Sequence, residues 1–107
     1  MAKKASADEA RYYLRDVAPE TCFWINNGAI IKNIDELTEA LKSIDKEKFK
    51  HHANKEKNDF AKWVDEVVQD NGLAKVISKI KSRQAMLKKV EARVKQLKKA
   101  AGYTQNP

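Results

Sequence analysis

Residues 73–101 read LAKVISKIKSRQAMLKKVEARVKQLKKAA, and the spacing of their aliphatic side chains is the strongest indication of the fold. These side chains recur in alternating steps of three and four residues, and only Arg83 interrupts the series. We call them the heptad seam: Leu73, Val76, Ile80, Leu87, Val90, Val94, Leu97 and Ala101. The pattern predicts one helix from Gly72 to about Ala100, ~29 residues and ~43 Å long.

Basic residues are concentrated in the same segment. Residues 71–107 contain ten Lys or Arg and one acidic residue, Glu91, whereas residues 1–70 contain twelve basic and fourteen acidic residues. The net charge of +7 therefore comes from the C-terminal segment. A cluster of positive charges on one helix favours a polyanionic partner.

The basic side chains allow two interpretations. Lysines two turns apart can follow a phosphate backbone, and only Arg83 and Arg93 carry the fork that could read bases. The alternative is a solvated helix face, but such faces usually mix charges, and on this helix only Glu91 could pair, with Lys88 or Lys95. We predict sequence-tolerant binding to the backbone of DNA or RNA, as in nucleoid- or ribosome-associated proteins. The predicted contacts are Lys75, Lys79, Lys81, Arg83, Lys88, Lys89, Arg93, Lys95, Lys98 and Lys99.

The heptad seam also allows two interpretations. It could pack on the rest of this chain, or on another helix from a second copy or a different protein. A body helix of ordinary length covers about three turns, so the segment from Val90 to Ala101 could project beyond the body. Lysines beside the seam oppose a tight parallel homodimer. The alternative function is therefore a helical interaction or scaffold module that associates through Leu87, Val90, Val94 and Leu97.

The first 71 residues predict a compact helical body with one hairpin. Ser6 and Glu9 have the spacing of a capping box, which begins a helix that we expect to reach Val17, before Pro19. The segments 21–25 and 29–32 favour β structure, and Asn26-Asn27-Gly28 between them tolerates a tight turn. The sequence therefore predicts a short hairpin within residues 21–32.

Cap residues predict three further helices in the body. Asn33 precedes an apolar face at spacings of three, four and three, and Asp45 precedes a short helix that reaches His52. Asn58 and Asp59 precede an amphipathic helix that ends or bends near residues 69–72. The fold class is thus mainly α: a small helical domain with one short β-hairpin, a long basic C-terminal helix over 72–101 and a frayed tail over 102–107.

Composition excludes several classes of protein and site. Cys22 is the only cysteine, so no internal disulfide can form, and neither a signal peptide nor a membrane-spanning stretch is recognisable. We expect a cytoplasmic protein that does not interact with a membrane.

His51 and His52 point about 100° apart on a helix, which does not suit a shared metal. A set of Cys22, His52 and Asp59 lacks any supporting spacing, so no catalytic residue, metal or cofactor is predicted.

The two tryptophans, Trp24 and Trp63, are candidate binding residues, because they could stack on bases or line a peptide groove. In a small domain, tryptophans more often supply the core, and we expect that role for both.

The body resembles a small prokaryotic, mainly archaeal, domain family of unassigned function over about residues 20–80. The most specific shared pattern is Phe-x-x-His followed by Asn-Asp-Phe-Ala-x-Trp, represented here by Phe49, His52, Asn58, Asp59, Phe60, Ala61 and Trp63. The resemblance implies a small mixed fold and supplies no activity. From the residues alone, the motif predicts a structural role: a cap, two buried rings, and a histidine that could hydrogen-bond the helix entry. The alternative is a functional surface at this motif.

Overall fold

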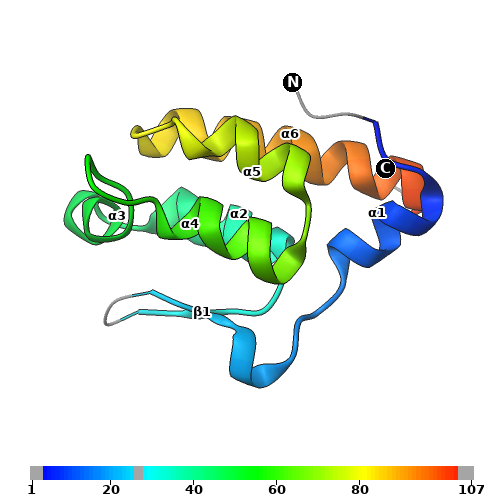
Figure 1. The fold of residues 1–107 in the computed structure, drawn as a ribbon, viewed down its shortest axis with the longest axis horizontal. Helices are drawn as coiled ribbons and strands as arrows, with labels where there is room; N and C mark the ends of the chain where they lie inside the picture. The colour runs from blue at the N-terminus through cyan, green and yellow to red at the C-terminus, as the bar shows by residue number, and fades with distance from the viewer. Residues whose placement is uncertain (1–3, 26–27, 104–107) are drawn as a thin grey trace.

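Six α-helices and one two-stranded sheet make up the described part of the chain, residues 4–25 and 28–103, in a computed structural model. The elements are α1 (Ala7–Leu14), the 3₁₀ turn η1 (Pro19–Thr21), β1 (Phe23–Trp24), β2 (Ile30–Ile31), α2 (Ile34–Ser43), α3 (Lys46–His52), α4 (Asp59–Trp63), the π-helical turn η2 (Val64–Val68), α5 (Asn71–Ser78) and α6 (Arg83–Ala101). The predicted mainly helical class with a single hairpin is confirmed (Figure 1).

Side-chain caps begin the body helices where the sequence predicts them. Ser6 accepts a hydrogen bond from the amide of Glu9, and the Glu9 carboxylate accepts one from the amide of Ser6. The side chains of Asn33, Asp45 and Asn58 each accept from the amide three residues ahead, at the starts of α2, α3 and α4. Each cap satisfies an amide that the helix itself leaves without a partner.

The hairpin lies across the bottom of the molecule in Figure 1. Its strands are antiparallel, with Phe23 opposite Ile31 and Trp24 opposite Ile30. The predicted turn residues at 26 and 27 lie outside the described residues. Helix α1 stops at Leu14 instead of reaching Val17, because the amide of Val17 donates to Lys32 O at 2.8 Å and draws the chain alongside the hairpin.

The prediction of one continuous helix over 72–101 is wrong, because the structure has two helices there: α5 ends at Ser78 and α6 begins at Arg83. At the end of α5, the Asn58 side-chain amide donates to Ile77 O at 2.9 Å. At the start of α6, the Ser82 hydroxyl accepts from the amide of Ala85. The longest dimension of the molecule is 36 Å, shorter than a helix of ~43 Å would require.

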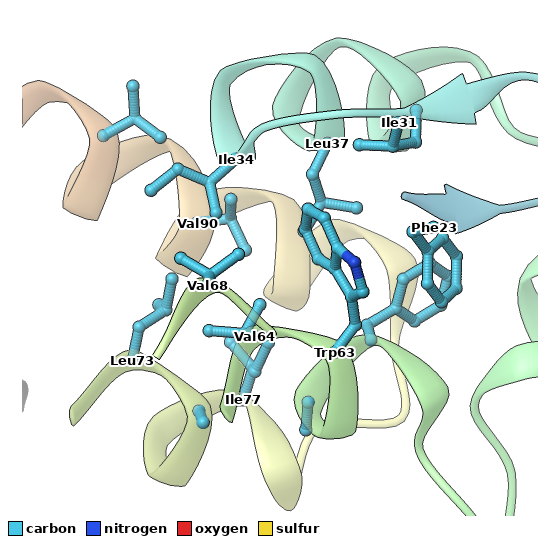
Figure 2. Packing of buried hydrophobic residues seen from close by; sticks show 14 of the residues in the cluster. Phe23, Ile31, Ile34, Leu37, Trp63, Val64, Val68, Leu73, Ile77 and Val90 are labelled. Carbon is cyan, nitrogen blue, oxygen red and sulfur yellow. The ribbon is translucent and has the colours of Figure 1, made fainter. Parts of the chain in front are cut away.

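Helix α6 turns back after the break, runs antiparallel beside α5, and ends next to α1 (Figure 1). It also packs along α2, so it forms a wall of the core instead of an appended arm. Figure 2 shows side chains converging from the hairpin, α2, α4, η2, α5 and α6, among them Phe23, Leu37, Trp63, Leu73 and Val90. The expectation that the chain from Val90 to Ala101 could project is therefore wrong.

The C-terminal end of α6 is held by a Schellman motif. Gly102 has a φ of 85°, its amide donates to Lys99 O, and the amide of Tyr103 donates to Lys98 O. Gly102 and Tyr103 are thus fixed on α6 instead of frayed, and residues 104–107 of the predicted tail lie outside the described part. Within the described ranges, no helix combines the length and apolar character needed to cross a bilayer.

Candidate nucleic-acid interface

Seven of the ten predicted phosphate contacts are exposed lysines on α5, α6 and the segment between them. Within the described part of the chain, none of their ammonium groups has an ion pair or hydrogen bond. We call them the lysine surface: Lys75, Lys79, Lys81, Lys88, Lys89, Lys95 and Lys99. Unpaired like charges at this density repel one another, so the surface attracts anions.

Glu91, the single acidic residue of the basic segment, does not neutralise this surface. Its carboxylate faces α2, where it lies 4.0 Å from the ammonium of Lys42. A hydrogen bond to Glu39 and the charge of that residue raise the pKa of Lys42, and the charge of Glu91 adds to this effect. Glu91 thus does not form the ion pair with Lys88 or Lys95 that the sequence allowed.

Arg93 is a core residue, so its assignment as a phosphate contact is wrong. Its Nε donates to Asp70 Oδ2 at 2.7 Å and its Nη2 donates to Asp70 Oδ1 at 2.9 Å. The two side chains are only 5% and 1% exposed. Asp70 also caps α5 by accepting from the amide of Leu73. Burial and the charges of Glu9 and Asp70 raise the pKa of Tyr13, whose ring lies 5.9 Å from the Arg93 guanidinium.

Arg83 and Lys98 are likewise engaged within the chain. Arg83 donates to Leu41 O at 2.8 Å and so caps the C-terminal turn of α2. Lys98 forms an ion pair of 2.9 Å with Asp35 in the first turn of α2. Both side chains fasten α6 to α2, and we therefore remove both from the predicted phosphate contacts.

The two remaining arginines also serve the fold. Arg11 donates to Ala101 O at the end of α6, and Arg15 donates to the carbonyls of Val67 and Val68 at the end of η2. The chain has four arginines in all, and each one holds a carbonyl or a carboxylate of the protein itself. The exposed cations of the surface are consequently lysines, which carry charge without the planar fork that reads guanine.

The predicted association residues are mostly buried. Val90, Val94 and Leu97 are 0%, 4% and 0% exposed, and Leu87 is half-buried. Their seam packs against α1 and α2 of the same chain. The prediction that these residues bind another helix is wrong for this fold, because their apolar surface is already covered.

Two hollows open along α6. The first is a groove of about 430 Å³ between α5 and α6, lined by Leu73, Val76, Lys88, Lys89, Ala92, Arg93 and Gln96. The second, of about 460 Å³, lies at the end of α6 and is lined by Lys95, Lys99, Gly102 and Tyr103. The sequence analysis did not identify Tyr103 as a site residue and placed it in the frayed tail.

The histidine motif is built into the aromatic core. His52 Nδ1 lies 2.9 Å from Asp59 Oδ2, and the His52 ring packs against Phe23 and Phe60. Burial raises the pKa of Asp59, but hydrogen bonds from His52 and Lys57 outweigh it and hold that pKa below its usual value. Cys22 Sγ lies near Ala18 O at 3.7 Å. No cluster of three metal-ligating side chains occurs among the described residues.

The tryptophans differ in their surroundings. Trp63 is buried, and its indole N–H donates to Thr21 O at 2.8 Å, so its predicted core role is confirmed. Trp24 is 66% exposed on the hairpin, so its predicted core role is wrong. The strand alternation explains the difference at the hairpin, because Phe23 takes the inward position and Trp24 the outward one.

Comparison of the chain with protein-family models, curated proteins and solved structures finds no match.

Proposed function

We propose that this protein binds nucleic acid without sequence preference, through the lysine surface on α5 and α6. The proposal rests on the different surroundings of the basic residues. The arginines and Lys98 form hydrogen bonds or ion pairs within the fold, whereas seven lysines are exposed and unpaired within the described residues. Among the described residues, folding has thus left seven lysines without an ion pair, although Glu56 and Asp65 line hollows beside Lys81 and Lys75.

The chemistry of lysine supports contact with phosphate instead of bases. An ammonium group is a point charge that can approach any phosphate oxygen, and each neutralised phosphate releases bound counterions. Specific readout of guanine usually requires a bidentate fork, which no arginine is free to supply. Binding through this surface would therefore tolerate any sequence, as in nucleoid- or ribosome-associated proteins.

The apolar seam supports the same conclusion. A basic helix with an exposed aliphatic stripe could equally well bind another protein, but here Val90, Val94 and Leu97 are covered by α1 and α2. The outward faces of α5 and α6 carry the lysine surface, with the groove between the two helices beside it.

A salt titration tests the proposal. Fluorescently labelled DNA and RNA oligonucleotides should bind with an affinity that falls linearly on a log–log plot against salt concentration. The double variant Lys88→Gln/Lys95→Gln should bind more weakly, and the salt slope should fall by ~1 for each lysine removed. The matched control is Lys46→Gln/Lys50→Gln, which removes the same charge from exposed positions on α3.

The control variant should bind like the wild type, because α3 lies at the opposite end of the molecule from the C-terminal end of α6, which carries Lys95 (Figure 1). Equal weakening by the two double variants would mean that net charge, and not this surface, drives binding. Absence of binding to every oligonucleotide at low salt would refute the proposal.

A further inference from the structure

The two hollows along α6 combine apolar or aromatic surface with lysines. The groove between α5 and α6 has Leu73, Val76 and Ala92 in its lining, with Lys88 and Lys89 beside them. Because lysine stems are aliphatic, these side chains extend the apolar wall while their ammonium groups stay in water. The groove can therefore hold a flat apolar group next to an anion.

The second hollow adds an exposed aromatic ring. Tyr103 is 49% exposed, and Lys95 and Lys99 line the same hollow. The Schellman motif fixes the backbone of this residue, since its amide donates to Lys98 O at 2.9 Å. Because this backbone is already fixed, a base that stacks on the ring needs to order only the side chain.

The spacing of the two hollows suits one strand. Ala92 of the groove and Lys99 of the second hollow are seven residues apart on α6, which is about 10 Å along the helix axis. Lys88, Lys95 and Lys99 follow one side of the helix between and around them. A backbone running along these lysines would pass both hollows within a few nucleotides.

These features distinguish single-stranded from duplex nucleic acid. Bases of a duplex are stacked inside it and cannot enter a hollow, so a duplex would use only the lysines. A single strand can place its bases on apolar and aromatic surfaces, and such stacking tolerates any base because each has a π face. The hollows add affinity only for the unpaired strand.

We infer that the preferred ligand of the lysine surface is single-stranded nucleic acid, whose bases enter the α5–α6 groove and stack on Tyr103. This inference rests on the proposed function and gives it a ligand class. DNA and RNA strands share the chemistry that the hollows recognise, so both belong in the test.

Anisotropy titrations of the full chain test the inference with a labelled DNA strand, an RNA strand of the same sequence, and the DNA duplex. Single strands should bind more tightly than the duplex at the same salt. Tyr103→Ala should weaken single-strand binding about tenfold, equivalent to ~1.4 kcal/mol, within the ~1–3 kcal/mol typical of base stacking. Tyr103→Phe should bind like the wild type, and duplex binding should not respond to either change. A difference between the DNA and RNA strands would identify which of them is favoured.

Two further variants control the experiment. Ala92→Leu narrows the groove without changing charge and should also weaken single-strand binding, with the duplex unaffected. Trp24→Ala removes an exposed aromatic ring on the hairpin, on the opposite side of the molecule in Figure 1, and should change nothing.

Thermal melting of each variant excludes unfolding as the cause. The inference is overturned, and the proposed function kept, if the duplex binds as tightly as the single strands and Tyr103→Ala has no effect. Failure of all three oligonucleotides to bind overturns both.

Discussion

The carboxylate of Asp70 and the guanidinium of Arg93 form a bidentate ion pair in the core, with both side chains almost fully buried. The pair joins the start of α5 to the middle of α6 and so holds the two helices antiparallel. It also removes from the surface one of the two arginines that the sequence analysis assigned to phosphate.

Breaking this pair should destabilise the fold. Arg93→Met leaves the Asp70 carboxylate buried without its guanidinium, which should lower the free energy of unfolding by ~3–5 kcal/mol. Urea denaturation at neutral pH measures the loss. Asp70→Asn added to Arg93→Met keeps the cap on Leu73 while removing the charge, and should restore part of the stability. An Arg93→Met variant as stable as the wild type would contradict the structural role.

Asn58 should contribute more than an ordinary cap, because its side chain serves two helices. Its oxygen accepts from the amide of Ala61 at the start of α4, and its nitrogen donates to Ile77 O at the end of α5. Asn58→Ala should cost ~2 kcal/mol, the upper range for a lost cap. Asn58→Asp keeps the acceptor and loses the donor, so chemical denaturation of the two variants separates the contributions. Equal stability of Asn58→Asp and wild type would show that the contact with Ile77 is unimportant.

Acid stability should depend on Asp59. Its pKa is lower in the folded protein than the ordinary value of 3.8, so the ionised form is favoured by folding. That stabilisation is complete above pH 3.8 and is lost as the pH falls below it through the folded-state pKa. Urea midpoints measured from pH 6 down to about pH 2 should fall less steeply for Asp59→Asn than for the wild type. Parallel curves for the two proteins would contradict this prediction.

The two tryptophans should differ strongly in their contribution to stability. Trp63→Ala leaves a cavity in the aromatic core and removes the hydrogen bond to Thr21, and should cost ~3–5 kcal/mol. Trp24→Ala removes an exposed ring whose residue lies opposite Ile30 in the hairpin, and should cost less than ~1 kcal/mol. Thermal melting compares them directly, and similar losses would be inconsistent with the exposure of Trp24.

Local features were predictable because their determinants lie within one helical turn. The caps at Ser6, Asn33, Asp45 and Asn58 bond to amides three residues away, so the residue types alone indicate them. The break between α5 and α6 was not predicted, because the aliphatic period of three and four resumes in the same register after its single interruption at Arg83, the first residue of α6. It depends in part on Asn58, whose nitrogen bonds to a carbonyl 19 residues further along the chain.

The candidate site was predictable only in part. Its location on the C-terminal segment and its sign follow from the charge distribution. The heptad pattern could not distinguish Arg93, which pairs with a residue 23 positions away, from Lys95, which faces solvent. Tyr103 was not identified, because its proximity to Lys95 and Lys99 depends on how the chain leaves α6.

The amino-acid sequence by itself determined the helical class, the starts of the body helices, the hairpin and the concentration of positive charge after Asn71. Tertiary structure decided which of those charges remain free and which apolar faces are covered. The physical reason is the sequence separation between the bonded groups. A helix cap bonds to an amide three residues away, whereas an arginine side chain bonds to a helix end or carboxylate that only the packing brings near. Only the packed chain therefore separates the arginines that hold the fold from the lysines that stay available to a ligand.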